Sequence, residues 1–483
     1  MKDSNSTPRL CGTRSPSWRL IAACVLLFSG VAGLSKPSAA VRADGLPGNG
    51  PIVPTVVASG LDDPRGLTVG PDGNLYGGIA GSGTATNPGG ECGAAAHGGA
   101  ATGGGVVRIA GSEVTTVSRN LPSTLGRFGQ VGAAAVAFIG NTMYVLEEGT
   151  CSGSAPKQPK GVYRVGAAGS VTLVANLTKY YSTHPVKTPD PGDFAPAGNP
   201  FSMMAMSGDL YVAEANHAEI DKVDPTNGTI TRLLDFSQEP WLGITGIASW
   251  QGSVYFADLT EFPVVPGTAG IFKLNADGST TQVASGLTAV AGLAIGADGT
   301  MYATELTTAA GMPKHGNGAV VSASQSGVVT TLTTDLYFPS GITVAPDGGL
   351  DVSDYSDQTA PETGEILHLA VPGAAAVRLQ RIGNGTTVSF TVSFVSAHPG
   401  DGWVEFGSGP GCSGLVELAT QDRVTGTTSH TVTVTGNDLP GTVGDIGIEP
   451  GVSYWFETVT VTQFGAEVDD NDGRCYSLTI PTS

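Results

Sequence analysis

A strand–turn–strand unit recurs along this 483-residue chain and restricts the folds that it can adopt. In the clearest copy, residues 63–76, apolar and small or polar side chains alternate over residues 67–70 (Leu-Thr-Val-Gly), which is the period of a β-strand. Residues 71–74 (Pro-Asp-Gly-Asn) predict a turn, because proline presets φ and glycine and asparagine tolerate positive φ. A second, antiparallel strand then begins at residues 75–76.

Six copies of this unit can be identified. They lie at residues 63–76, 134–144, 202–211, 246–255, 291–302 and 339–350. Counted from Ser202, Gly246, Gly292 and Gly341, the last three intervals are 44, 46 and 49 residues. A period of about 40–50 residues with about four strands is typical of a propeller blade. The sequence therefore predicts an all-β fold with a six-bladed β-propeller over residues 50–370. A strand at residues 55–59 is expected to complete the last blade and close the ring.

Residues 1–43 are expected to be a signal peptide. The segment begins with the basic residues Lys2, Arg9, Arg14 and Arg19. An apolar run at residues 20–34 follows, too short to span a bilayer comfortably, and a small-residue cleavage site ends near Ala43. The apolar run follows Cys24 instead of preceding it, which disfavours a lipid anchor there. We expect a secreted protein without a membrane span.

The charge balance excludes some partners. Residues 1–43 carry six of the 23 Lys and Arg residues and one of the 42 acids, so their removal changes the net charge from −19 to −24. Such an acidic protein is not expected to bind nucleic acid or anionic membranes. The same charge favours a solvated extracellular protein or one that attracts cations.

The chain changes character after residue 370. Residues 371–376 are expected to be a linker, and residues 377–483 a β-sandwich, because alternating segments at 387–394, 429–435 and 454–462 are separated by glycine- and proline-rich turns. Residues 450–456 (Pro-Gly-Val-Ser-Tyr-Trp-Phe) resemble the turn and aromatic strand of fibronectin type III modules. An immunoglobulin- or fibronectin III-like sandwich is therefore expected.

The cysteines and insertions suggest covalent cross-links. Cys92 and Cys151 lie in insertions of adjacent blades, residues 81–105 and 149–160, and export favours their oxidation to a disulfide. Two free thiols are the alternative. Cys412 and Cys475 are expected to pair within the sandwich. A further insertion, residues 179–200, is rich in Pro, Asp and Gly and is expected to be a loop without a regular element.

The propeller resembles NHL-type repeat proteins and, more closely, the secreted ScyD/ScyE family, named after scytonemin biosynthesis proteins. The resemblance is carried by residues 56–67 (Val-Val-Ala-Ser-Gly-Leu-Asp-Asp-Pro-Arg-Gly-Leu), the turn at 71–76, the glycine-rich insertion around Cys92, and residues 211–214 with 221–225. It spans roughly residues 50–370 and implies a six-bladed ring. It implies little chemistry.

Connectivity places a candidate site on one face of the ring. The start of the first strand and the end of the second strand of each unit must lie on the same face. The ligand-face candidates at the strand starts are Arg65, Asn199 and Ser340, and His217 lies in a short loop at this face. An acid follows the second strand's aromatic residue or its equivalent in five units: Glu147, Glu214, Asp258, Glu305 and Asp354. Blade one has Ile79 instead.

These acids have two interpretations. Each can accept hydrogen bonds from backbone N–H groups of the next turn, which is a structural role. Alternatively, they form a carboxylate cluster near the channel mouth that holds Ca²⁺, which takes six to eight oxygen ligands. In related six-bladed lactonases a bound metal polarises the substrate carbonyl. His217 is either a solvated loop residue or a general base near neutral pH.

No sequence motif names a reaction. The chain contains no His-Glu-x-x-His, Gly-x-Ser-x-Gly or Walker sequence. We therefore expect a binding or scaffold protein whose partner is a small molecule, a glycan or another protein. The alternative is a metal-dependent lactonase- or esterase-type hydrolase that uses a divalent cation bound by these carboxylates.

Overall fold

The computed structural model describes fifteen stretches of the chain. They are residues 52–82, 103–126, 129–149, 158–189, 195–238, 243–260, 262–356, 363–371, 375–382, 387–407, 415–417, 427–434, 452–462, 465–469 and 475–479. The expected signal peptide and its cleavage site lie outside the described residues. Cys92, Cys151 and Cys412 do as well, whereas Cys475 is described and buried.

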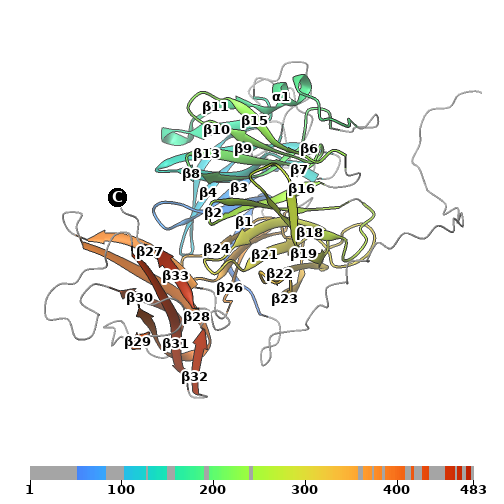
Figure 1. The fold of residues 1–483 in the computed structure, drawn as a ribbon. Coiled ribbons are helices and arrows are strands. Elements are labelled where there is room, and N and C mark those ends of the chain that lie inside the picture. Colours follow the sequence, from blue (N-terminus) through green and yellow to red (C-terminus); the bar gives the residue numbers. More distant parts are fainter. Residues whose placement is uncertain are drawn as a thin grey trace, which may run out of the picture. The chain divides into compact units, whose positions relative to one another are not determined.

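Six four-stranded antiparallel sheets form the propeller (Figure 1). Blade one contains β2 (Pro64–Val69), β3 (Leu75–Ile79), β4 (Gly104–Ala110) and β5 (Glu113–Leu121). Blade two contains β8 (Ala133–Ile139), β9 (Thr142–Glu147), β10 (Gly161–Val165) and β11 (Val171–Asn176), with a 3-10 turn, η1 (Ala167–Gly169), before β11. Blade three contains β12 (Pro200–Met206), β13 (Asp209–Glu214), β14 (Glu219–Val223) and β15 (Ile230–Asp235).

The remaining blades repeat this order. Blade four contains β16 (Ile244–Trp250), β17 (Ser253–Asp258), β18 (Ala269–Leu274) and β19 (Thr280–Leu287). Blade five contains β20 (Val290–Ile295), β21 (Met301–Glu305), β22 (Gly318–Ala323) and β23 (Val329–Leu336). Blade six contains β24 (Ile342–Val344), β25 (Leu350–Asp354) and β26 (Gly364–Leu369), and its fourth strand is β1 (Thr55–Leu61).

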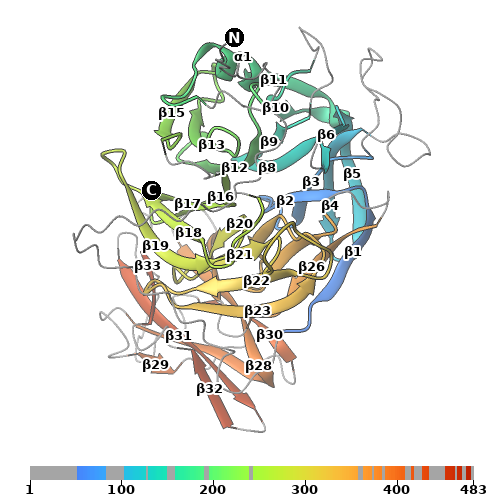
Figure 2. The same cartoon turned by 90° about the vertical axis from the view of Figure 1, so that its right-hand side faces the viewer.

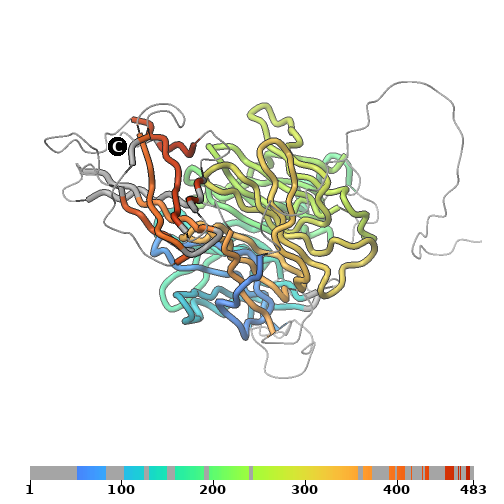
Figure 3. The backbone as a smooth tube through the Cα atoms, turned by 90° about the horizontal axis from the view of Figure 1, so that it is seen from below, coloured from blue at the N-terminus to red at the C-terminus, as the bar shows by residue number. Residues whose placement is uncertain are grey.

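The strand β1 closes the ring, as the sequence predicts. It pairs antiparallel with β26, with Val56 opposite Leu367 and Leu61 opposite Gly364. In Figure 3 the blue start of the described chain runs beside its orange part. The N-terminal strand is therefore the outer strand of the last blade, so blades one and six share a continuous stretch of chain.

The first strands of the blades surround the ring's centre. Each contacts the first strand of the next blade, and β24 contacts β2, which completes the cycle. Figure 2 shows β2, β8, β12, β16 and β20 near the middle and β5, β11, β15, β19 and β23 farther out. The repeat's glycines belong to this contact. A β-carbon at Gly66 would lie 2.8 Å from the Ala134 carbonyl oxygen of the next blade, so the close approach of the strands requires glycine.

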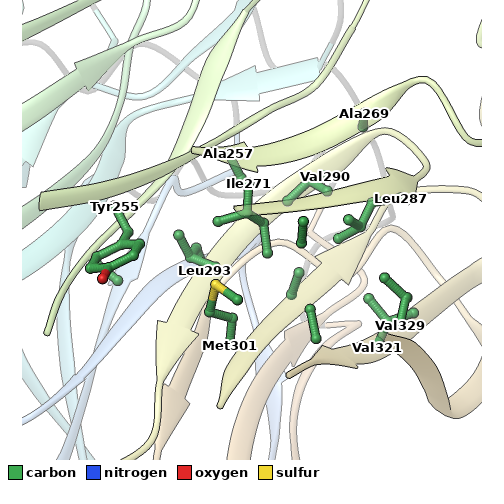
Figure 4. Packing of buried hydrophobic residues seen from close by; sticks show 14 residues of the cluster. Tyr255, Ala257, Ala269, Ile271, Leu287, Val290, Leu293, Met301, Val321 and Val329 are labelled. Atoms are coloured by element: carbon green, nitrogen blue, oxygen red, sulfur yellow. The ribbon is translucent and has the colours of Figure 1, made fainter. Parts of the chain in front are cut away.

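Apolar side chains fill the space between neighbouring blades. In one cluster, Tyr255 and Ile271 of blade four pack with Leu293, Met301 and Val321 of blade five (Figure 4). These side chains are at most 8% exposed. The strands thus place apolar side chains on both faces of each blade. Burial of these side chains between neighbouring blades stabilises the ring.

One expected loop contains a helix. Residues 177–183 form α1 (Leu177–Thr183), which overlaps the insertion at 179–200 that was expected to lack a regular element. Asn176 caps the helix, because its side chain accepts a 2.8 Å hydrogen bond from the Lys179 N–H. Leu177 and Tyr181, one turn apart, are both buried and anchor it. The expectation was wrong for this part because the helix begins before the polar stretch.

The C-terminal part contains seven strands in one hydrogen-bonded network. They are β27 (Ala375–Ile382), β28 (Thr387–Gly407), β29 (Val416–Glu417), β30 (Thr427–Val434), β31 (Ser453–Thr462), β32 (Gly465–Asp469) and β33 (Tyr476–Thr479). The long β28 changes partners along its length: its first half pairs with β27 and β30, its second half with β29 and β31. Both halves contribute to one core, through Phe394 and Phe406. Two layers around a shared core make this part a β-sandwich, and β27 begins within the segment expected as a linker.

The described residues include no helix that is long and apolar enough to cross a membrane.

Candidate functional site

The strand register confirms that the start of each first strand and the end of each second strand lie on the same face of the ring. In blades three, four and five, the first residue of the first strand lies opposite the last residue of the second: Pro200 opposite Glu214, Ile244 opposite Asp258, and Val290 opposite Glu305. We call this side of the ring, with the starts of the first strands and the ends of the second strands, the channel face. The Pro-Asp-Gly turns lie on the opposite side.

A cavity of about 350 Å³ lies at the centre of the ring. Most of its lining comes from the first strands of the six blades or the residues just before them and is small or apolar. Four residues contribute hydroxyl groups: Thr68, Ser202, Ser340 and Thr343. Among the described residues that line it, Arg65 and Glu148 carry charge. Two of the four ligand-face candidates, Arg65 and Ser340, therefore lie in this cavity.

Arg65 is held in place by hydrogen bonds. Its Nη2 donates to the Gln130 carbonyl oxygen at 2.5 Å and lies 3.3 Å from Asp63 Oδ2. Gln130 belongs to a hairpin between blades one and two, formed by β6 (Thr124–Gly126) and β7 (Gly129–Val131). The side chain of Arg65 keeps 12% of its surface exposed. The hairpin thus orients a cation at the cavity.

Ser340 lies beside Arg65 across the junction of blades six and one. A β-carbon on the next residue, Gly341, would strike the Arg65 carbonyl, so the two strands touch. The Ser340 hydroxyl lies 3.1 Å from the Ser353 hydroxyl, which accepts a 2.7 Å hydrogen bond from the Gly341 N–H. These bonds place the hydroxyl group of Ser340 within the lining.

All five strand-end acids are buried, with exposures of 0–2%. Each accepts a backbone hydrogen bond. The donors are Gly149 N–H for Glu147 (2.6 Å), Asn199 and His217 N–H for Glu214, Gly270 N–H for Asp258 (2.6 Å), Thr288 N–H for Glu305 (2.7 Å) and Tyr337 N–H for Asp354 (2.8 Å). None of the five is among the described residues that line the cavity. Their geometry is that of acceptors that hold the loops of the channel face.

Burial raises the pKa of several of these acids. It raises the pKa of Asp258 to about 7 and that of Asp354 to about 6, while the hydrogen bonds from Gly270 and Tyr337 act in the opposite direction. The pKa of Glu147 is raised well above its usual value, again mainly by burial. These carboxyl groups are therefore held where a negative charge is costly.

Asn199 and His217 meet the acids of blade three. Asn199 contributes its backbone N–H to Glu214, and His217 Nδ1 lies 3.5 Å from Glu214 Oε2. The same nitrogen lies 3.7 Å from Glu219 Oε1. Glu214, His217 and Glu219 each bring one ligand atom within 4.8 Å of the others. The loop histidine is thus enclosed by carboxylates, with 14% of its side chain exposed.

Sequence reasoning missed most of this blade-three cluster. Glu219 and Asp221 lie on the same side of β14, since they are two residues apart, and Arg232 of β15 contacts Glu219. Tyr181 of α1 packs edge-on against the His217 ring at 5.8 Å. The available signal was the short run from 214 to 221, with three acids and one histidine on either side of a tight turn.

Comparisons with known proteins give structural neighbours but no family. No family model matches the sequence, and no curated protein matches it. Similar solved structures include the calcium-binding protein regucalcin from Agrobacterium tumefaciens (14% identity, 66% of this chain and 94% of that chain, TM-score 0.43). A gluconolactonase from Xanthomonas campestris (11%, 65% and 88%, 0.40) and the PQQ-bound aldose sugar dehydrogenase from Streptomyces coelicolor (11%, 65% and 96%, 0.42) are further examples. At these values the likeness says nothing about activity.

Proposed function

We propose that this protein is a secreted binding protein whose propeller takes a small polar ligand in the central cavity. The observation that carries this proposal is the pairing of Arg65 and Ser340 in the lining, on the adjoining strands of blades one and six. A cavity of about 350 Å³ is in the range for small-molecule sites, which combine apolar walls with a few placed polar groups.

The lining indicates the chemistry of the ligand. Arg65 offers N–H donors that suit a carboxylate, and its anchoring to Gln130 and Asp63 reduces the entropy lost on binding. Glu148 and the lining hydroxyl groups can accept hydrogen bonds from ligand hydroxyls. A small hydroxylated carboxylate satisfies both.

The test is a thermal-shift comparison of gluconate with sorbitol, two open six-carbon polyhydroxy chains of which only gluconate carries a charge. Gluconate is expected to raise the unfolding midpoint of the wild-type chain, by mass action, and sorbitol to raise it less. Arg65→Gln should remove the gluconate effect. The matched control is Arg108→Gln, which breaks an exposed 2.9 Å ion pair with Asp72 on the opposite side of the ring and should leave it intact.

An equal response to both probes, or one that persists in Arg65→Gln, would contradict the proposal.

The metal-dependent hydrolase remains the alternative prediction. It requires turnover of a lactone such as gluconolactone that stops in EDTA, returns with Ca²⁺ and is lost in Asp258→Ala.

We also infer that the propeller is of the ScyD/ScyE type and the C-terminal sandwich of the fibronectin III type, because of the residues quoted for each resemblance.

A further inference from the structure

The cluster in blade three has an unusual strand pairing. Glu214 ends β13 and Glu219 begins β14, and the two residues lie directly opposite each other in the antiparallel ladder. Both are 0% exposed. Like charges placed opposite each other across a ladder destabilise a sheet, and buried carboxylates need a compensating charge. The pair therefore needs compensating positive charge, of which Arg232 beside Glu219 supplies a part.

The loop between these strands places an imidazole at that position. Ala218 adopts a left-handed conformation (φ 55°), and the turn brings His217 Nδ1 to 3.5 and 3.7 Å from the two carboxylates. Four-coordinate Zn²⁺ with ligands at about 2.0–2.1 Å needs neighbouring ligand atoms about 3.4 Å apart. The two separations from His217 are close to this requirement, and all three ligand atoms lie within 4.8 Å of one another.

Orphaned polar atoms surround the same position. Both oxygens of Asp221, the Tyr181 hydroxyl and Glu219 Oε1 are buried without a hydrogen bond of good geometry. Tyr181 and Asp221 interact with each other at longer range, and Glu219 Oε2 contacts Arg232. Asp221 is 0% exposed and lies on the same side of β14 as Glu219. Buried polar groups are normally satisfied, so these atoms indicate that a charged species belongs among them.

The nearby cations do not balance the acids. Arg232 contacts Glu219, but its guanidinium also donates to the backbone carbonyls of His184 (2.5 Å) and Pro185 (3.1 Å). Lys160 donates to the Gly198 carbonyl at 2.6 Å and is shared electrostatically among Glu148, Glu214 and Glu147. Three buried acids, Glu214, Glu219 and Asp221, thus share one dedicated arginine.

We propose that Glu214, His217 and Glu219 bind one divalent transition-metal cation of the Zn²⁺ type, with Asp221 adding to the field that holds it. The nitrogen ligand and the small number of donors favour Zn²⁺ over Ca²⁺, which prefers six to eight oxygens. The three residues are not part of the cavity lining, so this site is separate from the proposed ligand site. The partly exposed side chain of His217 gives the ion its access from solvent.

The test is direct metal binding by the full chain. The protein is purified in chelator, its thiols are alkylated so that cysteines cannot hold metal, and Zn²⁺ is titrated calorimetrically against Ca²⁺. We expect one Zn²⁺ per chain and weaker Ca²⁺ binding. Co²⁺ in place of Zn²⁺ should show the visible absorption of a four-coordinate site.

Two variants assign the site. His217→Gln and Glu219→Gln should each weaken Zn²⁺ binding by more than about 100-fold, since loss of even supporting groups costs about 10–100-fold. Glu365→Gln is the matched control, because Glu365 faces Asp354 across β25 and β26 as Glu219 faces Glu214, with no histidine in a corresponding cluster among the described residues.

Either of two results would overturn the proposal. One is a wild-type chain that takes up no Zn²⁺ and gives no Co²⁺ spectrum. The other is Zn²⁺ affinity that is unchanged in folded His217→Gln and Glu219→Gln, which would place the ion elsewhere. The Co²⁺ spectrum is recorded on the wild-type chain, so the proposal can be tested even if a variant does not fold.

Discussion

Gly341 lies just before the first strand of blade six and packs against the first strand of blade one. A β-carbon there would collide with the Arg65 carbonyl group and lie 2.9 Å from the Gly66 α-carbon, and neither backbone atom can move aside without shifting a strand. We therefore expect Gly341→Ala to lower the free energy of unfolding by about 3 kcal/mol, through overpacking. Urea unfolding monitored by tryptophan fluorescence measures this.

The control for Gly341→Ala is Gly208→Ala. Gly208 has φ 87°, and no atom lies within 4 Å of the position that a β-carbon would take, so alanine there costs only the left-handed conformation, about 1 kcal/mol. Because Gly341 does not have a positive φ, equal losses in the two variants would show that the contact between the blades does not carry the expected cost of Gly341→Ala.

His368 predicts a pH dependence on the turn side of blade six. Its Nδ1 lies 2.9 Å from Asp351 Oδ1 and its Nε2 lies 3.3 Å from Asp347 Oδ2. The hydrogen bonds to Asp347 and Asp351 raise the pKa of His368 from 6.5 to about 10, against the opposing effect of burial. Because the folded pKa is the higher one, the stabilisation is complete below about pH 6.5 and is lost as the pH rises toward about 10.

The measurement is the unfolding midpoint of wild type and His368→Gln across this range. The wild-type advantage should be largest at pH 6 and should shrink steadily to pH 10. An advantage that does not change with pH would mean that the histidine is neutral in the folded protein and contributes only by packing.

At the scale of elements, only a few side chains of the strand β1 are buried and stabilise the closure of the ring. Leu61 is 3% exposed and packs in a core shared with blade one, whereas Val56 on the same strand is 55% exposed. Leu61→Ala should cost about 3 kcal/mol of unfolding free energy through lost burial and a cavity. Val56→Ala should cost less than about 0.5 kcal/mol. Comparable costs for both would argue that backbone pairing alone closes the ring.

The helix α1 could not be predicted from its local sequence. The helix has seven residues, about two turns, and a Pro- and Asp-rich stretch follows it. Leu177 and Tyr181 are a single pair of apolar residues, which is too few to indicate a helix by periodicity. Tertiary burial decides the structure of this segment, since an isolated helix of this length is not stable in water.

At the scale of the whole molecule, the repeated unit predicted the blades because each strand–turn–strand unit is encoded by a short continuous stretch of sequence. Alternating strands, the Pro-Asp-Gly turn and a period of 44–49 residues together define a four-stranded blade, and the closing strand follows from the odd strand at the start. The same connectivity predicted the channel face. It also led to Arg65 and Ser340, because both occupy the first-strand starts that surround the cavity.

The blade-three cluster depends on strand register and on packing between elements, which the amino-acid sequence alone does not show. The sequence marks Glu214 as equivalent to Asp258 and Glu305, but only the register places Glu219 opposite it, and only the packing of α1 brings Tyr181 against His217. Equivalent positions in the repeat therefore differ in chemistry through what is packed on them, and a comparison between blades within one chain reveals the exception.

The closing strand β1 can pair with its partner strand only late in the synthesis of the chain. Thr55 in β1 is hydrogen-bonded to His368, 313 residues later in the chain. At about 5–20 residues per second, a ribosome needs roughly 15–60 s to make the chain between them. Throughout that time the first strand has no partner and offers an open edge to other chains. A factor that shields this edge during synthesis should therefore raise the yield of folded protein.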